Sequence, residues 1–344
     1  MPVELSAPRG TEAKAQTPRS EAPVFVLGCG RSGTKLLYHT LLSAGGFAVY
    51  HAESNAFNLI GLRFGSLERR RNREKLLQAW LRSKLFVRSG LTEQEIAPRI
   101  LDECRNAGDF LRLLMETIAH KQGVRRWAES TPLHLLCLRF IKRVVPDALI
   151  IHIIRDGRDV ALSLNKIGWI RPLPWDRRRS LIAAGIFWKW MVTKGLSSGR
   201  DLGRDYIEVH YEELLHQPRE TLARLSAFID QTLDYDHIQK IGLGTVNDPN
   251  SSFRDDEAQG RNPLGRWKAL LSAEQLAELE GVIGDLLVEL GYRLAAPRNK
   301  RRGSLPVRIM SRVYPAWFDL KLWLKTHTPL ARLAAVGRMG IGQQ

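Results

Sequence analysis

A glycine-rich loop near the start of the chain combines residue types that bind anions. Its residues are Gly28, Cys29, Gly30, Arg31, Ser32, Gly33, Thr34 and Lys35. In such a loop between a strand and a helix, backbone N–H groups and the helix N-terminus converge on a phosphate or sulfate. The Arg31 guanidinium can add two parallel hydrogen bonds to the same group. The alternative is a tight turn that holds no ligand, because the glycine frame alone has low specificity.

The loop departs from the nucleotide triphosphatase pattern G-x-x-x-x-G-K-[S/T] at its last two positions. In that pattern the lysine reaches the β- and γ-phosphates and the following hydroxyl binds Mg²⁺. Here Thr34 precedes Lys35. One residue rotates a helix by about 100°, so Lys35 points away from the anion if Thr34 points toward it. The loop therefore predicts an anionic ligand that needs no metal, with Arg31 as the nearest cation.

A second arginine and serine pair follows the most apolar segment of the chain. Arg155 comes directly after residues 148–154, and Ser163 lies eight residues further on, inside an expected helix. An arginine at the carboxyl end of a strand and a serine two turns into the next helix can converge on one phosphate. In the alternative interpretation, Arg155 and Asp156 cap the helix and Ser163 packs in the core.

These motifs lie between segments whose patterns alternate between strand and helix. Strands are expected over residues 24–27, 47–50, 126–128, 148–154 and 206–209. Helices are expected over about 34–44, 132–145, 156–167, 177–197, 218–230 and 273–290, with more helices in 56–122. This alternation predicts an α/β fold with a doubly wound, mainly parallel sheet flanked by helices. Ligands of such sheets bind at the carboxyl ends of the strands.

Composition divides the chain into three parts. Residues 1–22 are rich in Pro, Ala, Ser, Thr and charge and predict a disordered leader, 23–296 predict a domain with a helical insertion at about 56–122, and 297–344 form a basic segment. No apolar run is long enough to predict a membrane span. The three cysteines form no C-x-x-C pair, which predicts neither a zinc site nor a disulfide framework and fits a reducing, cytoplasmic compartment.

More than half of the net charge belongs to the carboxyl-terminal segment. The chain has a net charge of +16, and residues 298–344 hold ten basic residues against Asp319 alone. Apolar and aromatic residues recur there at roughly helical spacing, with an interruption expected at Pro315. A basic amphipathic segment of this kind lies on the anionic cytoplasmic face of a membrane, as a peripheral contact. Alternatively, it packs back onto the domain with its arginines outward.

Taken together, the motifs resemble those of sulfotransferases that use 3′-phosphoadenosine-5′-phosphosulfate (PAPS). Residues 30–34 with the following 36–37 resemble that family's 5′-phosphosulfate loop, and the Arg155 and Ser163 pair resembles its 3′-phosphate site. Further similar segments, in the expected order, are 129–132, 211–214, 265–268 and 291–292. The resemblance covers about residues 23–293 and implies a P-loop-like sulfotransferase fold.

The resemblance implies PAPS as the co-substrate, without a metal. The residues that it places at the donor are Arg31, Ser32, Gly33, Thr34 and Lys35 on the phosphosulfate side, Arg155, Ser163 and Arg266 at the 3′-phosphate, and Trp267 at the adenine. A tryptophan in such a turn can equally anchor the core, so this alternative stays open for Trp267.

The implied reaction is in-line transfer of a sulfuryl group to a hydroxyl or an amine. It needs a base for the acceptor proton and a cation for the leaving phosphate. Glu53 is the preferred base and His51 the second choice, and either can instead be a surface or capping residue. Many family members carry a lysine where this chain has Ser130. Arg31, or else Lys35, must then supply the positive charge.

The sequence leaves the acceptor open among carbohydrates, lipids and tyrosyl groups. The insertion and the segment Arg171–Arg179 are expected to shape its site, and their basic residues fit an anionic acceptor such as a sugar acid or glycolipid head group. Two other functions remain as alternatives: a P-loop-type kinase that uses Mg-ATP, and a polyanion-binding protein. The chain has no RNA-recognition or helix-turn-helix signature, so no nucleic-acid partner is expected.

Overall fold

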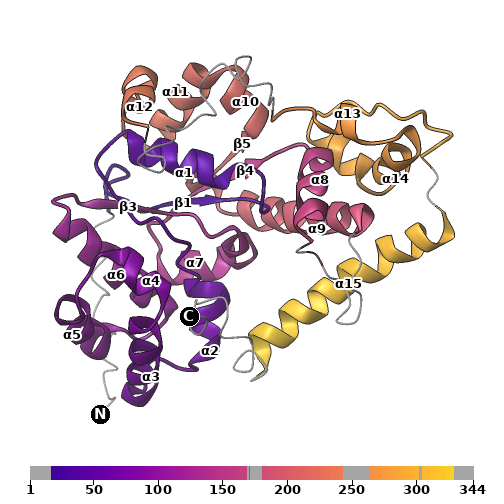
Figure 1. The fold of residues 1–344 in the computed structure, drawn as a ribbon. Coiled ribbons are helices and arrows are strands. Elements are labelled where there is room, and N and C mark those ends of the chain that lie inside the picture. Colours follow the sequence, from indigo (N-terminus) through magenta and orange to yellow (C-terminus); the bar gives the residue numbers. More distant parts are fainter. Residues whose placement is uncertain (1–16, 169, 171–179, 243–262, 302–303, 329–344) are drawn as a thin grey trace, which may run out of the picture.

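The computed structural model describes residues 17–168, 170, 180–242, 263–301 and 304–328. They form a parallel sheet with helices on both faces (Figure 1). The strands are β1 (Val24–Leu27), β2 (Phe47–Ala48), β3 (Arg126–Glu129), β4 (Leu149–Ile154) and β5 (Tyr206–His210). Their order is β2-β3-β1-β4-β5, and each strand is parallel to its neighbours. The predicted α/β fold with a mainly parallel, helix-flanked sheet is confirmed.

Two apolar cores lie on the two faces of the sheet. One face packs on α1 (Thr34–Ser43), α10 (Tyr211–His216), α11 (Pro218–Ile229) and α12 (Tyr235–Ile241). The other packs on α6 (Ala107–Lys121), α7 (Leu138–Val144), α8 (Gly157–Ile167) and α9 (Leu181–Arg200). Strand β1 contributes side chains to both cores, because Val24 and Val26 point to the first core while Phe25 and Leu27 point to the second.

The remaining helices lie before β3, in short segments before α7 and β5, and near the carboxyl end. The insertion forms a π-helix η1 (Ala56–Ile60), α2 (Gly61–Arg63), α3 (Arg70–Leu81), α4 (Lys84–Ser89) and α5 (Glu93–Glu103) before α6. Short 3₁₀ helices η2 (Pro132–Cys137) and η3 (Gly203–Asp205) precede α7 and β5. The last helices are α13 (Trp267–Leu270), α14 (Ala273–Glu289) and α15 (Leu305–His327).

Strand β2 is shorter than the predicted 47–50 because a side chain takes the place of the neighbouring strand. Gln122 accepts from the Val49 N–H at 2.7 Å and donates to the Val49 carbonyl at 3.0 Å. The ladder to β3 therefore stops at Ala48. The predicted helix over 132–145 also differs, since it divides into η2 and α7.

Residues 17–22 lie against the domain and so are not part of the disordered leader predicted for 1–22. The Arg19 guanidinium donates to the Phe228 carbonyl at 2.8 Å and to Asp205 at 3.1 Å. In turn, the Arg19 carbonyl accepts a hydrogen bond from Arg126 at 2.6 Å. These contacts fix the entry of the chain into β1. Residues 1–16 lie outside the described residues.

The insertion is helical as predicted, and it carries a buried core of its own. Trp80 on α3 is fully buried and packs edge-on against Phe110 of α6, with ring centroids 5.7 Å apart. One member of its basic cluster, Arg73, is buried and donates to the Leu101 carbonyl at 2.7 Å. The insertion is thus an integral part of the domain.

Helix α15, which is yellow in Figure 1, packs against α9. Phe318 contacts Trp190 with ring centroids 5.3 Å apart, and Asp319 accepts a hydrogen bond from the Trp190 indole at 3.0 Å. The interruption expected at Pro315 is wrong, because the helix continues through that residue. Among the described residues, none of the helices has the length and hydropathy needed to cross a membrane.

Candidate functional site

The glycine-rich loop connects β1 to α1 and has a left-handed backbone at two positions. The φ angle is 75° at Arg31 and 94° at Gly33. A side chain at Gly33 would collide with the ring of Tyr211, and one at Gly28 would collide with the carbonyl of Ile153. Close packing on β4 and α10 therefore requires glycine at both positions. The loop is held at the carboxyl ends of β1 and β4, where ligands of such sheets bind.

Two buried polar atoms in this region have no hydrogen-bond partner among the described residues. One is the Ser32 hydroxyl, in a side chain with no exposed surface, and the other is Nε of Arg155. A buried polar group normally has a partner, because losing one costs about 1–3 kcal/mol. Each is therefore a candidate donor to an anion bound at the loop.

The structure brings the two predicted anion-binding motifs together. Arg155 donates to the Arg31 carbonyl at 3.2 Å, and Nε of Arg31 donates to the Ser163 hydroxyl at 2.9 Å. The Arg155 guanidinium lies 4.5 Å from the ring centroid of Tyr211 and donates to the Pro263 carbonyl. Residues separated by more than 120 positions in the sequence thus form one basic cluster.

Lys35 lies near two histidines beyond the loop. Burial and the nearby charges of Lys35 and His51 lower the pKa of His39 to about 4. Burial and Lys35 also lower the pKa of His51. The His39 and His51 rings meet edge to face, with centroids 5.9 Å apart. Both imidazole rings are therefore neutral near pH 7. A neutral imidazole is the form that can accept a proton from another group.

The candidate base Glu53 is exposed on the loop that follows β2. Its backbone carbonyl accepts a hydrogen bond from the Asn55 side chain at 3.0 Å. The next residue, Ser54, is buried and donates its hydroxyl to Glu129 at 2.8 Å. The end of β3 therefore positions the loop that carries Glu53.

Glu129 is a buried carboxylate that accepts hydrogen bonds from the loop after β2, from the turn after β3 and from η2. It accepts hydrogen bonds from the hydroxyl and N–H of Thr131 and from His134 Nδ1, the last at 2.9 Å. His134 Nε2 accepts from the Phe57 N–H at 3.2 Å, so its proton is on Nδ1. Burial raises the pKa of Glu129, but the interactions with His134 and Thr131 outweigh it and hold the pKa at about 2. Ser130, beside it, is half-buried.

Trp267 is buried in a charged network next to Arg155. Its indole N–H donates to Asp156 at 3.1 Å, and the Arg158 guanidinium lies 3.8 Å from its ring centroid. Arg158 also pairs with the buried Glu280 at 2.7 Å. These contacts match the core-anchor alternative for Trp267. Its neighbour Arg266 is exposed.

Two residues that hold the Trp267 turn in place, Asp159 and Glu280, were not predicted from the sequence. Asp159 accepts from the N–H groups of Gly265 and Trp267 at 2.8 and 3.0 Å, which ties the turn before α13 to α8. Glu280 was also missed, since it lies 122 residues from Arg158. The acidic positions in the 155–163 motif were the only available signal for Asp159, and nothing local distinguished Glu280.

Thr34 is buried at the start of α1, and Lys35 beside it is exposed. Among the described residues, no group of three or more His, Cys, Asp or Glu side chains is arranged to hold a metal ion. The segment Arg171–Arg179, which we expect at the acceptor, lies outside the described residues.

Comparisons with known proteins agree with the resemblance in the motifs. The model of the family described as "Sulfotransferase family" matches residues 23–235. A Caenorhabditis briggsae protein provisionally named protein-tyrosine sulfotransferase is 28% identical over 225 residues, which cover 62% of this chain and 74% of that protein. The nodulation protein NoeE of Sinorhizobium fredii is 25% identical over 230 residues, or 58% of this chain and 53% of that protein.

Two solved structures have a similar fold. The sulfotransferase domain from the Synechococcus PCC 7002 olefin synthase aligns with a TM-score of 0.53 and 17% identity, covering 84% of this chain and all of that one. The sulfotransferase domain from the curacin biosynthetic pathway aligns with a TM-score of 0.51 and 15% identity, covering 82% of this chain and all of that one. At these identities the likeness concerns the fold.

Proposed function

Because its residues 23–235 match the family model, this chain belongs to the sulfotransferase family, and we propose that PAPS is its sulfuryl donor. The observation that supports this donor is the pair of unpartnered buried atoms at the loop, Ser32 Oγ and Arg155 Nε. A doubly anionic nucleotide would satisfy both. The proposed donor contacts are Arg31, Ser32, Gly33, Thr34 and Lys35 at the phosphosulfate, and Arg155, Ser163 and Arg266 at the 3′-phosphate, with the Trp267 turn beside them.

The proposed donor supplies a sulfuryl group whose leaving partner is a phosphate. In the transfer, the bond from sulfur to the acceptor oxygen forms while the bond from sulfur to the phosphate oxygen breaks. Arg31 is exposed at the loop and carries the charge that would stabilise the leaving phosphate. Its contact with Ser163 at 2.9 Å orients the guanidinium before the nucleotide binds.

Glu53 is the proposed base, with His51 as the second candidate. The Glu53 carboxylate would take the proton of the acceptor hydroxyl. The hydrogen bond from Ser54 to Glu129 would keep the loop that carries Glu53 in place. His51 is also suited to accept a proton, because its lowered pKa keeps it neutral near pH 7. The variants below separate the two.

The test is transfer of radiolabelled sulfuryl from PAPS to a panel of glycans, hydroxylated lipids, phenols and tyrosyl peptides. The tyrosyl arm is included because two relatives, 28% and 26% identical, carry the provisional name protein-tyrosine sulfotransferase. With the acceptor that reacts, Glu53→Gln should lower kcat by about 10²–10⁴ and leave nucleotide affinity unchanged. The control Glu274→Gln removes an exposed carboxylate on α14 and should have no effect. A full rate in Glu53→Gln, with a large loss in His51→Asn, assigns the base to His51.

We also propose that the outer face of α15 makes a peripheral contact with an anionic membrane. Exposed apolar side chains recur along this face at Leu305, Ile309, Val313, Leu320 and Trp323. They lie opposite the buried stripe of Val307, Tyr314 and Phe318. Two basic residues of the same helix, Arg308 and Arg312, are also exposed. A helix with apolar and basic surface of this kind binds at the lipid interface.

A further inference from the structure

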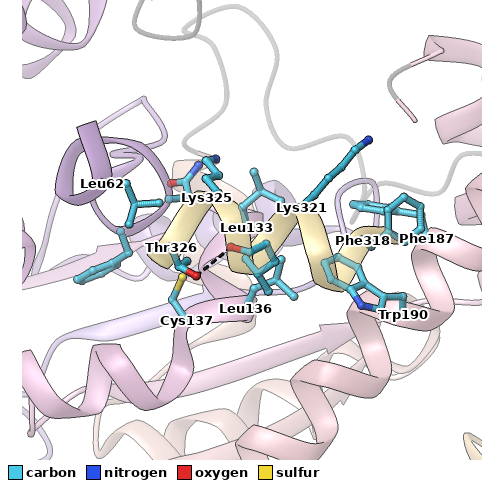
Figure 2. A pocket seen from close by; sticks show the side chains of 13 residues that line it. Leu62, Leu133, Leu136, Cys137, Phe187, Trp190, Phe318, Lys321, Lys325 and Thr326 are labelled. Carbon is cyan, nitrogen blue, oxygen red and sulfur yellow. Dashed lines mark hydrogen bonds between the residues drawn. The ribbon is translucent and has the colours of Figure 1, made fainter. Parts of the chain in front are cut away.

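An apolar cavity lies beneath α15, on the side that faces the domain. Its volume is about 180 Å³. It is walled chiefly by Phe57, Leu133, Leu136, Phe187, Phe318 and Leu322. Figure 2 shows the side chains that line it around α15, among them Leu136, Cys137, Lys321 and Lys325. An apolar cavity of about 150 Å³ in another protein takes up benzene, so this one has room for a short length of hydrocarbon.

The cavity adjoins a larger cleft whose lining is basic. The two share the walls Phe57, Leu62, Leu136, Cys137, Leu322 and Thr326. The cleft has a volume of about 1100 Å³ and is lined by four basic residues, Arg105, Arg139, Arg143 and Lys194, against two acidic ones, Glu68 and Asp319. Lys194 pairs with Asp319 at 3.0 Å, and Arg139 pairs with Asp201 at 2.7 Å, so the other charged residues of the lining are Arg105, Arg143 and Glu68. The cleft therefore favours an anion.

Two basic residues also belong to the lining of the apolar cavity. They are Lys321 and Lys325, one helical turn apart on α15. Among the described residues, those that line this cavity include no Asp or Glu. A ligand that filled both spaces would need a hydrocarbon part for the cavity and a negatively charged part for its basic surroundings.

We infer that this pair of spaces binds an anionic amphiphile with a single hydrocarbon chain, such as a fatty acid or an alkyl phosphate. The chain lies in the cavity under α15, and the head group lies among the basic residues of the adjoining cleft. This inference does not depend on the proposed sulfuryl transfer. A neutral hydrocarbon would lack the attraction to the basic residues of the cleft. A short-chain acid would leave the apolar cavity unfilled.

Binding is measured by titration calorimetry of the full chain with butyrate, octanoate, decanoate and decanol, with the acids kept below micelle formation and decanol below its solubility limit. We expect one decanoate per chain and affinity that rises about fourfold for each methylene buried, until the cavity is full. Decanol should bind at least tenfold more weakly than decanoate. Equal affinities for butyrate and decanoate, or for decanol and decanoate, overturn the inference.

The variant Leu136→Trp places a larger side chain in the shared wall and should abolish decanoate binding. Lys325→Glu should weaken it at least tenfold. The matched control is Arg312→Glu, which makes the same charge change on the same helix at a residue outside both linings, and should change affinity less than twofold. Equal losses in Lys325→Glu and Arg312→Glu would contradict a specific site.

Cys137 gives a readout that needs no substitution. It lines both spaces and is partly exposed, whereas Cys29 and Cys104 are buried. Burial raises the pKa of the Cys137 thiol to about 11, so alkylation by an N-alkylmaleimide should be slow enough to time by mass spectrometry. Decanoate should slow alkylation at least fivefold, and butyrate should not. No protection by decanoate in the wild-type chain overturns the inference, even if Leu136→Trp fails to fold.

Discussion

Ser32 and Arg155 illustrate how single side chains can be arranged for a ligand before it binds. Each is positioned by its own segment, Ser32 by the left-handed loop and Arg155 by the end of β4 and the ring of Tyr211. Each nevertheless keeps a buried polar atom without a partner among the described residues. The cost of that arrangement, about 1–3 kcal/mol for each atom, is offset when an anion binds. A change at Ser32 can therefore alter the affinity for the nucleotide without lowering the stability of the fold.

Replacing Ser32 by alanine should weaken nucleotide binding without weakening the fold. The hydroxyl donates to no described residue, so the melting temperature should stay the same or rise. A hydrogen bond to a charged group contributes about 1.5–3 kcal/mol, which predicts a Kd for 3′-phosphoadenosine-5′-phosphate (PAP) about 10- to 150-fold higher. Titration calorimetry and thermal melting measure the two effects.

Ser43→Ala serves as the control for Ser32→Ala, because it removes a serine hydroxyl at the other end of α1, where it donates to the His39 carbonyl at 2.8 Å. Its PAP affinity should match that of the wild type. If Ser32→Ala binds PAP as tightly as the wild type, the Ser32 hydroxyl does not contact the nucleotide.

Strand β4 and helix α9 meet around a buried histidine. His152 has no exposed surface, and Nδ1 shares a hydrogen bond of 2.6 Å with the Tyr206 hydroxyl. Its ring faces Gly195 of α9, where any side chain would collide with it. Burial, with the charges of His210 and Arg200, lowers the pKa of His152 to about 3. The sheet and α9 therefore pack around a neutral imidazole.

This histidine should make the fold less stable as the pH falls. Between its ordinary pKa of about 6.5 and its folded value of about 3, the unfolded chain binds a proton that the folded chain does not. The free energy of unfolding should thus fall with pH, by roughly 2 kcal/mol from this group between pH 7 and 5. Urea denaturation of the wild type and His152→Gln at both pH values measures the difference. An equal pH dependence in both proteins would contradict this.

Local sequence patterns predicted that a strand or helix exists better than they predicted where it begins and ends. Continuous apolar runs predicted β1 and β4, since both are buried on two faces and need no partner to be recognised. The early end of β2 could not be predicted, because the Gln122 side chain that replaces its ladder lies 73 residues from Val49. Likewise, the docking of residues 17–22 depends on Arg126, more than 100 residues away.

The candidate site was predicted to the extent that its motifs are local. The loop with Arg31 and the pair of Arg155 and Ser163 were each recognisable as segments, but their contact with each other is tertiary. The hydrogen bond from Ser54 to Glu129 spans 75 residues and left no periodic signal. The network that buries Trp267 depends on Glu280 and was missed for the same reason.

At the scale of the whole molecule, the net charge of +16 is distributed unevenly along the chain, because residues 298–344 hold ten basic residues against Asp319 alone. Helix α15 belongs to this basic segment. Helix α15 packs on α9 through one face and exposes apolar side chains on the other. The packing matches the alternative in which the segment lies against the domain, and the exposed apolar face is the one that we propose for the membrane contact.

The triple variant Ile309→Ser, Val313→Ser and Leu320→Ser should reduce sedimentation with vesicles that contain anionic lipid by several-fold. These side chains are exposed, so their loss should not disturb the packing of α15 on α9. PAP affinity should stay unchanged, since the loop is untouched. Vesicles of neutral lipid should bind the wild type weakly, and added salt should weaken binding to anionic ones.

Val87→Ser is the control for the α15 surface, because Val87 is the most exposed of the large apolar residues on α4 and lies outside α15. It should sediment as the wild type does. Equal sedimentation of the wild type and the triple variant would show that the outer face of α15 does not bind membranes.

The central claim is that the loop of Arg31 and Ser32 holds a 3′-phosphoadenosine nucleotide without a metal. Titration calorimetry of the full chain with PAP in EDTA, and separately with Mg-ATP, tests it directly. We expect one PAP bound per chain in the absence of metal, and binding of Mg-ATP that is at least a hundredfold weaker. Binding of Mg-ATP with no binding of PAP would contradict it and favour a P-loop kinase instead.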